Sequence, residues 1–243
     1  MRIVLFSIFG YNIYSHGVFF VLAMIIASYF YFRLAEKEHL STTKFLMNII
    51  LTIIIGVIAS RILFYFMNLK YYTNLYQMAK IWQGGLVSFG GFIFGGLTFL
   101  LLIRAQKENV GKWLNLAGVA FPLGIAIGRI GCVLAGEVGK RYYGPFAYFY
   151  HFPVTSFEIY LCLAIFAINF SLYLYAKKYI IDYFLFFTFV TLYSFFRIFI
   201  DAYRGDPNLI IGINLSQLTS FIIFALSFFI FGIYYMKRKA KTP

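Results

Sequence analysis

The sequence predicts an all-α, polytopic membrane protein with about seven transmembrane helices. Hydrophobic residues make up 62% of the 243 residues and charged residues only 12%, whereas soluble domains contain about 25% charged residues. Apolar segments of roughly twenty residues, the length that crosses the hydrocarbon core of a bilayer, recur along the chain. Basic residues gather in every second connection between these segments, which is typical of multi-pass membrane proteins. We expect residues 1–243 to form a single transmembrane domain.

The expected spans share an apolar composition and are separated by polar or aromatic connections. They cover approximately residues 14–34, 45–66, 84–103, 114–136, 157–176, 183–203 and 215–236. Two longer connections, at about 67–83 and 137–156, are rich in the aromatic residues that favour membrane interfaces. We expect both to be excursions on the outer side of the membrane.

The distribution of charge predicts the orientation of the chain. Lysine and arginine clusters follow the first, third, fifth and seventh spans, and the positive-inside rule places such clusters in the cytoplasm. The N-terminus is then outside and the C-terminus cytoplasmic. The net charge of +13 is therefore a topology signal and a preference for anionic lipid, and no nucleic-acid partner is expected. Because charges rather than a small-residue cleavage site follow the first span, no cleavable signal peptide is expected.

The segment from Gly128 to Glu137 carries a cation where a membrane span should exclude one. An arginine such as Arg129 costs about 2.5–3.5 kcal/mol at the centre of an inserted helix, so it is expected to face the protein interior or a wet cavity. Small residues beside it, Gly131 among them, let a backbone or a ligand approach closely. The combination predicts a binding site for an anionic lipid headgroup.

Three arginines are expected at a similar depth. Arg61, Arg129 and Arg197 each lie roughly five to seven residues from the outer end of an even-numbered span, which is about 7–10 Å along a helix. The planar guanidinium suits phosphate because it donates two parallel hydrogen bonds. The alternative is that each arginine extends separately to the outer headgroups.

Further polar and small residues are candidates for the same site. Arg197 and Asp201 are spaced i,i+4 and Arg204 follows three residues later, so all three can share one helix face. Asp201 can equally belong to a structural ion-pair network. Gly90 and Gly91 in the third span allow either a close lipid approach or a close helix contact, and packing alone is the simpler interpretation.

The candidates for proton transfer lie near the expected outer ends of the spans. His16 is a candidate base because histidine changes charge near neutral pH. Glu137 and Glu158 flank the second excursion, and either can orient an arginine or accept a proton. A structural role is the simpler interpretation for His16, and it is equally open to the two acids. Cys132 and Cys162 form no metal-ligand spacing, so we expect packed thiols and neither a metal site nor a cofactor.

Several segments together resemble the prolipoprotein diacylglyceryl transferase family over about residues 10–235. Gly128-Arg129-Ile130-Gly131 is similar to the Gly-Arg-aliphatic-Gly signature of that family. The other matching segments are Pro122-Leu123-Gly124, Gly84-Gly85 with Gly90-Gly91, Pro153 with Glu158, the run from Arg197 to Arg204, and Ser216-Gln217-Leu218 with Ser220.

The chain also departs from the family pattern at polar positions near the expected chemistry. His16, Cys132 and Asn115 stand where the family has Tyr, Asn and Asp. Further departures are Phe89 for a His of some members, Thr155 for Gln, Lys140 for Gly, and Asp201 for the longer acid. The arginines of the pattern are retained, so the departures bear on turnover more than on lipid binding.

The resemblance implies a lipid-modifying transferase of the bacterial cytoplasmic (inner) membrane, acting in lipoprotein biosynthesis. Such an enzyme transfers the diacylglyceryl group of phosphatidylglycerol to the lipobox cysteine of a preprolipoprotein and releases glycerol phosphate. It would use Arg129 and Arg197 against the phosphate, Asp201 to orient Arg197, and His16 or Glu137 as base. Arg61, Arg129, Arg204, Gly90, Gly91 and Gly131 would bind the headgroup. A catalytically inactive phospholipid-binding paralogue, a transferase with another acceptor, and an anion transporter are the alternatives.

Overall fold

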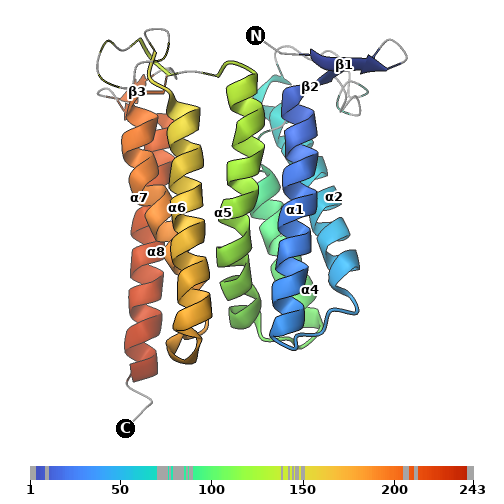
Figure 1. The fold of residues 1–243 in the computed structure, drawn as a ribbon, viewed down its shortest axis with the longest axis vertical. Coiled ribbons are helices and arrows are strands. Elements are labelled where there is room, and N and C mark those ends of the chain that lie inside the picture. Colours follow the sequence, from blue (N-terminus) through green and yellow to red (C-terminus); the bar gives the residue numbers. More distant parts are fainter. Residues whose placement is uncertain are drawn as a thin grey trace. The chain divides into compact units, whose positions relative to one another are not determined.

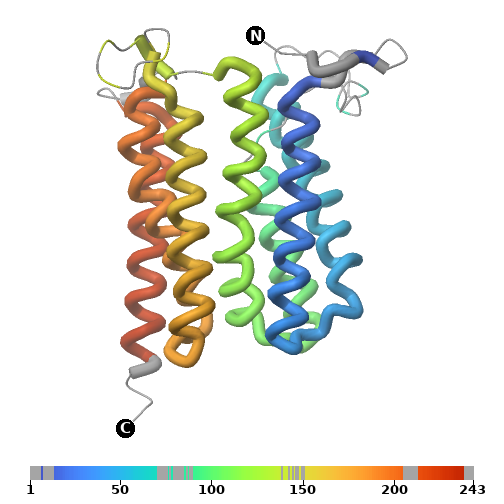
Figure 2. Tube along the Cα trace, in the orientation of Figure 1, coloured from blue at the N-terminus to red at the C-terminus, as the bar shows by residue number. Residues whose placement is uncertain are grey.

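The structure is a computed structural model, and it is mainly helical (Figures 1 and 2). It describes residues 4–8, 11–69, 76, 78, 85, 87, 90–137, 139–141, 143, 145, 148, 151–204, 208–210 and 213–239. The helices in this part are α1 (Ser15–Lys37), α2 (Phe45–Met67), α4 (Gly96–Ala105), α5 (Val110–Leu134), α6 (Val154–Tyr175), α7 (Phe184–Ala202) and α8 (Leu215–Lys239). A π-helical segment η4 (Gly91–Gly95) leads into α4, and a short 3-10 segment η5 (Lys177–Tyr179) follows α6.

Two small antiparallel hairpins accompany the helices. Strands β1 (Val4–Ile8) and β2 (Tyr11–Tyr14) pair so that Val4 faces Tyr14, and the second strand leads directly into α1. Strands β3 (Asn208–Ile210) and β4 (Ile213–Asn214) connect α7 to α8.

The prediction of about seven transmembrane helices is confirmed in part, for the described residues, which contain seven α-helices. Six of them, α1, α2, α5, α6, α7 and α8, are long and apolar enough to cross a membrane. The third expected span corresponds to a shorter apolar helix, Gly91–Ala105. Most of residues 84–89, including Gly84 and Phe89 of the expected glycine-rich start, lie outside the described part, as do most of the predicted excursion at 67–83 and the turn at 205–207.

Large apolar side chains cover the outer surfaces of the helices. Ile25 and Tyr29 on α1 and Phe228 and Phe229 on α8 each expose about half or more of their surface. A soluble protein buries such side chains, whereas a helix in a bilayer directs them into lipid. The exterior therefore agrees with the predicted integral membrane protein.

The chain divides into two compact units, which are described separately below. Unit 1 comprises residues 1–31 and 111–243, and unit 2 comprises residues 32–110. Within unit 1, the starts of α1, α6 and α8 lie at the same end as the ends of α5 and α7 (Figure 1). We call this end of unit 1 the site end, because the polar side chains described below gather there.

Two buried asparagines fix α5, α6 and α7 against one another in unit 1. Asn169 of α6 donates to the carbonyl oxygens of Gly118 and Leu185 at 2.8 and 3.0 Å. Asn115 of α5 accepts a hydrogen bond from the backbone N–H of Leu185 at 2.8 Å and donates to the carbonyl of Ile181 at 2.9 Å. Buried side-chain hydrogen bonds hold membrane helices in register. This register sets the positions of the polar residues of the site end along the helix axes.

Glycines on α5 allow α1 to approach closely. A Cβ atom on Gly131 would lie 2.8 Å from the Cβ of Phe19 and 3.2 Å from the Cα of His16, which no side chain tolerates. Ser15 adds a hydrogen bond to the carbonyl of Gly131 at 3.3 Å. The start of α1 is therefore held directly against the last turn of α5.

Unit 2 packs through glycine contacts of the same kind. A Cβ on Gly90 would lie 2.9 Å from the backbone of α2 at Ala59, and one on Gly91 would lie 2.8 Å from the hydroxyl of Ser60. Asn48 and Gln106 exchange two side-chain hydrogen bonds, at 3.2 and 2.9 Å, between α2 and the end of α4. The glycines of the third span thus have a packing role, and their predicted contact with lipid stays a prediction.

Candidate active site

The side chain of Glu158 is the centre of a charged network at the site end. Its carboxylate lies 2.7 Å from Nε of Arg129 on α5 and 2.8 Å from a terminal nitrogen of Arg197 on α7. Glu158 is 1% exposed, and the side chains of the two arginines are 22% and 14% exposed. One buried carboxylate therefore joins two guanidiniums from different helices.

The second carboxylate of the network is Asp201 on α7, which is completely buried. It contacts Nε of Arg197 at 3.0 Å and a terminal nitrogen of Arg204 at 3.8 Å, and it accepts a hydrogen bond from the Ser220 hydroxyl at 3.5 Å. Arg197 also donates to the hydroxyl of Tyr193, above whose ring its guanidinium lies. The predicted i,i+4 pair thus belongs to a network that orients Arg197 from three sides.

The start of α8 supports Asp201 through the backbone. Asn214 donates its side-chain amide to the carbonyl of Asp201 at 2.6 Å. Asn214 and Gln217 also exchange side-chain-to-backbone hydrogen bonds of 2.8 and 3.3 Å, the reciprocal pattern of a capping box at a helix start. The polar start of α8 therefore fixes the position of the acid that holds Arg197.

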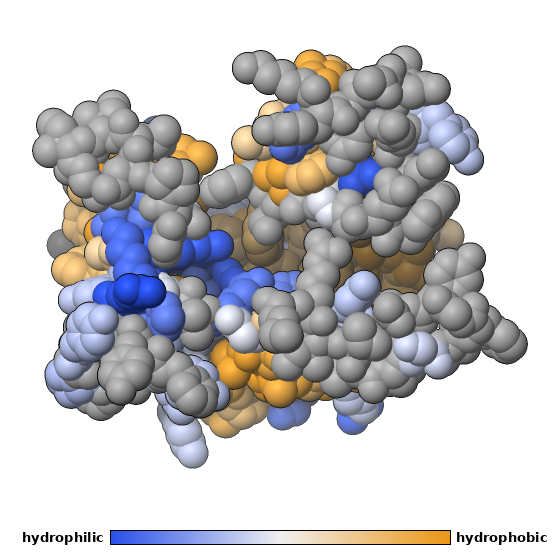
Figure 3. All heavy atoms as spheres, turned by 90° about the horizontal axis from the view of Figure 1, so that it is seen from above, coloured by the Kyte–Doolittle hydropathy of each residue, from blue (hydrophilic) through white to orange (hydrophobic). Residues whose placement is uncertain are grey.

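The charges of this network do not cancel. Among the described residues joined by these ion pairs, three arginines (Arg129, Arg197, Arg204) and two carboxylates (Glu158, Asp201) give 3 − 2 = +1. Figure 3 looks onto the site end and shows hydrophilic side chains gathered over α6, α7 and α8. A surplus cation beside apolar helices attracts an anionic headgroup, because charge interactions are stronger where water is largely excluded.

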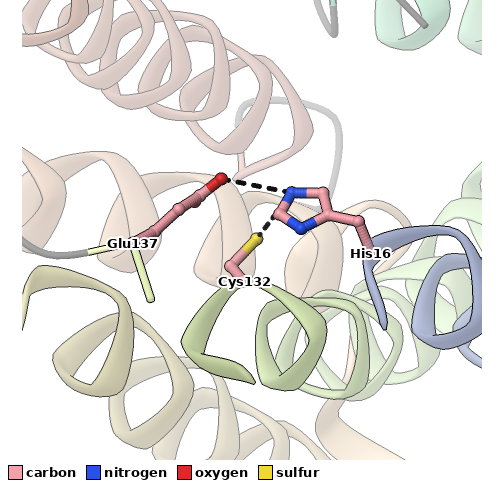
Figure 4. A group of neighbouring side chains, drawn as sticks. All are labelled: His16, Cys132 and Glu137. Atoms are coloured by element: carbon pink, nitrogen blue, oxygen red, sulfur yellow. Dashed lines mark hydrogen bonds and ion pairs between the residues drawn. The ribbon is translucent and has the colours of Figure 1, made fainter. Parts of the chain in front are cut away.

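His16, Cys132 and Glu137 form a second cluster (Figure 4). Nε2 of His16 is 3.4 Å from Sγ of Cys132 and 3.2 Å from a carboxylate oxygen of Glu137. One nitrogen, one sulfur and one oxygen thus lie within 4.8 Å of one another. A terminal nitrogen of Arg129 lies 3.8 Å from the same sulfur, which connects the cluster to the arginine network.

The local backbone explains how Glu137 returns to Cys132. Gly136 adopts φ +74° after the last turn of α5. The N–H of Glu137 donates to the carbonyl of Cys132 at 3.1 Å, and the N–H of Gly136 donates to that of Val133 at 2.9 Å. This is the Schellman motif, in which a left-handed glycine reverses the chain. Arg129 and Cys132, three residues apart, lie on one helix face.

The structure places the sequence-predicted site residues in three groups. Arg129, Arg197, Asp201 and Arg204 lie in the arginine network, and His16 and Glu137 lie in the second cluster. Gly131 lies where α1 packs closely against α5. Arg61, Gly90 and Gly91 belong to unit 2, where Arg61 is buried and donates to the carbonyls of Met78 and Gly85, each at 3.0 Å. The matched depth of Arg61 with the other arginines stays a prediction.

Sequence reasoning missed two contributors and undervalued a third. Tyr193 carried no signal beyond its helical spacing from Arg197. Cys132 was expected to be a packed thiol, and it is buried, but it also faces His16, which is 116 residues away in the chain. Glu158 was one of two equivalent acids, and only the fold shows that it bridges two arginines.

Known proteins are similar to this chain over nearly its whole length. The sequence model of the family described as prolipoprotein diacylglyceryl transferase matches residues 3–233. The phosphatidylglycerol–prolipoprotein diacylglyceryl transferase of Dehalococcoides mccartyi is 30% identical, and the alignment covers 98% of this chain and 95% of the relative. The enzymes of the same name from Clostridium tetani (26% identical, covering 96% and 98%) and, numbered 2, from Clostridium perfringens (27%, covering 100% and 99%) align over similar lengths. This chain therefore belongs to the prolipoprotein diacylglyceryl transferase family.

Proposed function

We propose that this protein transfers the diacylglyceryl group of phosphatidylglycerol to the lipobox cysteine of preprolipoproteins and releases glycerol phosphate. The observation that carries the proposal is the pair Arg129 and Arg197, held by one buried carboxylate in a network of net charge +1. In the reaction, the bond between the glyceryl carbon and the phosphate oxygen breaks, and a carbon–sulfur bond forms. The phosphate gains a negative charge as it leaves.

The arginine network suits that leaving group. Cations that are fixed in place before the reaction stabilise developing charge without reorganising, and this is commonly the largest contribution to catalysis. Glu158 and Asp201 hold the guanidiniums of Arg129 and Arg197 in place. Both arginines therefore act against the phosphate, Asp201 orients Arg197, and Arg204 contributes to the headgroup site.

The acceptor thiol must lose its proton, and the second cluster is where we place that step. Nε2 of His16 accepts the proton, and the carboxylate of Glu137, 3.2 Å away, stabilises the resulting charge. Because Cys132 lies between this imidazole and Arg129, the acceptor sulfur and the phosphate are handled by adjacent groups. We also retain Gly131, and Arg61, Gly90 and Gly91 of unit 2, as proposed headgroup-binding residues.

The proposed location is the bacterial cytoplasmic membrane, crossed several times by one transmembrane domain. Basic residues mark the ends of helices opposite the site end in unit 1, including Lys177 and Lys178 after α6 and Lys237 in the last turns of α8. The positive-inside rule assigns them to the cytoplasm. The site end, with the N-terminus, then faces outward, where a translocated preprolipoprotein presents its cysteine.

The test is a transfer assay with purified protein, phosphatidylglycerol vesicles and a lipobox peptide, read by mass spectrometry. We expect a diacylglyceryl mass increase on the peptide cysteine. Arg129→Ala and Arg197→Ala should each reduce the rate at least ~100-fold, because each removes a fixed cation from the leaving phosphate. The matched control is Arg33→Ala, which alters an exposed arginine paired with its neighbour Glu36 and should retain the wild-type rate. Bound phosphatidylglycerol without peptide modification would instead identify a lipid-binding protein.

A further inference from the structure

We propose that His16, Cys132 and Glu137 bind one divalent metal ion of the zinc class, with a fourth coordination position that receives the acceptor thiol. The metal site itself stands on the cluster geometry alone. The role of the fourth position rests on the proposed transferase function.

The first argument is the convergence of the three ligand atoms on a single point. Both contacts of His16 use the same nitrogen, Nε2, at 3.4 Å from the Cys132 sulfur and 3.2 Å from the Glu137 oxygen. Tetrahedral zinc with bonds of about 2.0–2.3 Å separates a nitrogen from a sulfur ligand by ~3.6 Å and from an oxygen ligand by ~3.4 Å. The two observed separations fall about 0.2 Å below these values, and the sulfur and the oxygen lie within 4.8 Å of each other.

The second argument is that a metal gives every member of the cluster a role. A single imidazole nitrogen carries either one hydrogen or one lone pair, so Nε2 cannot bond well to both the thiol and the carboxylate. In a purely acid–base cluster, Cys132 is superfluous. With a metal ion at the centre, the nitrogen, the sulfur and the oxygen are all ligands of the kinds that zinc prefers.

Charge and position favour the same conclusion. A thiolate from Cys132 and the carboxylate of Glu137 balance the charge of a divalent ion. The ligands are also held in advance: Gly131 and Ser15 fix the start of α1, and the Schellman turn fixes Glu137. The side chains of His16 and Glu137 remain 50% and 48% exposed, so the cluster is open to an incoming group.

Three protein ligands with one open position is the arrangement of catalytic rather than structural zinc. A thiol that coordinates such an ion is deprotonated outright. With the ion bound, His16 is a ligand and no longer the base proposed above, so the acceptor proton would pass to solvent. The acceptor sulfur would then attack the glyceryl carbon, and glycerol phosphate would leave with the electron pair of the broken carbon–oxygen bond. The metal ion is unchanged by the cycle.

Metal binding is tested on the full chain in detergent, independently of activity. Chelator-treated protein is titrated with Zn²⁺ against a chromophoric competitor, and with Co²⁺ as a spectroscopic probe. We expect one ion per chain and a sulfur-to-cobalt charge-transfer band. Cys132→Ser should abolish that band and weaken Zn²⁺ binding at least tenfold, and His16→Ala should weaken it similarly. Cys162→Ser, which alters the other buried cysteine in α6, is the matched control and should change neither.

The outcomes separate the metal site from the transferase function. The metal site is overturned if the cobalt spectrum lacks the sulfur-to-cobalt band, or if that band persists in Cys132→Ser. If chelation abolishes peptide modification and Zn²⁺ restores it, the whole proposal is supported. If the ion binds but chelation leaves transfer unchanged, the metal site stands and its role toward the acceptor thiol is overturned. Diacylglyceryl transfer without any metal binding overturns the metal site and leaves the transferase function intact. Metal binding without diacylglyceryl transfer leaves the metal site intact and overturns the transferase function.

Discussion

At the scale of single residues, the network depends on carboxylates that water does not reach. Glu158 and Asp201 are almost entirely buried, and each contacts two guanidiniums. Removing one partner of a buried ion pair leaves an uncompensated charge and costs about 3–5 kcal/mol. An acid that contacts no substrate can therefore control both the stability of the protein and the position of its cations.

Glu158→Gln tests this dependence. The amide keeps the shape of the side chain but loses the charge that holds Arg129 and Arg197, so we expect a loss of about 3 kcal/mol in unfolding free energy, measured by denaturant titration in detergent. Glu36→Gln, which removes an exposed acid paired with Arg33, is the control and should cost less than about 1 kcal/mol. Equal stabilities of the two variants would show that the buried acid is not needed to balance the arginines.

Arg197→Lys tests whether geometry matters beyond charge. Lysine keeps the positive charge, but its compact ammonium cannot contact Glu158, Asp201 and Tyr193 together as the guanidinium does. We expect the rate of peptide modification to fall about 100-fold at saturating lipid. Arg204→Lys, which alters the longer ion pair of 3.8 Å with Asp201, should fall tenfold at most. A fully active Arg197→Lys enzyme would contradict the oriented role of this guanidinium.

The residue-scale contacts also show where sequence reasoning ends. The i,i+4 spacing of Arg197 and Asp201 predicted their neighbourhood, because a helix fixes which residues share a face. No spacing relates Glu158 to arginines on two other helices, or His16 to a sulfur 116 residues away. These contacts depend on how the helices pack, and the residue spacing within one helix does not predict that packing.

At the scale of elements, the start of α1 and the end of α5 form the second cluster together. The close approach at Gly131 brings His16 over the last turn of α5, and the glycine turn after Leu134 brings Glu137 back toward it. The sequence marked the glycines as places of close approach without showing what approaches. The fold supplies the partner, which is the N-terminal turn of α1.

Gly131→Ala tests this arrangement. The new Cβ would lie 2.8 Å from Phe19 and 3.2 Å from His16, so α1 must shift away from α5. Such overpacking costs typically about 1–3 kcal/mol, and we expect peptide modification to fall at least tenfold as His16 leaves Cys132. Gly128→Ala is the matched control on the same helix, because its Cβ would meet Ala23 at an ordinary 3.7 Å. Equal activities would mean that the approach at Gly131 does not position the cluster.

At the scale of the whole molecule, composition predicted the helices well, because the bilayer demands long apolar segments whose backbone groups are satisfied internally. Six helices meet that demand in the described residues, whereas Gly91–Ala105 is shorter than the expected span. The π-helical start of that segment packs its glycines against α2 in unit 2, which is a tertiary contact. A hydropathy pattern does not predict contacts between helices.

The orientation of the chain gives the last prediction, because a transferase acting on translocated substrates needs its site end outside. Single cysteines introduced at Arg141, in the connection between α5 and α6, and at Lys177, just after α6, lie at opposite ends of α6. In cells whose envelope admits the reagent to the outer face, a membrane-impermeant maleimide should label Arg141→Cys at once and Lys177→Cys only after lysis. Both native cysteines are buried, and the unsubstituted protein measures their background labelling. The reverse pattern would place Arg129 and Arg197 on the cytoplasmic side, away from any exported lipobox, and would remove the proposed acceptor while leaving the phospholipid site in place.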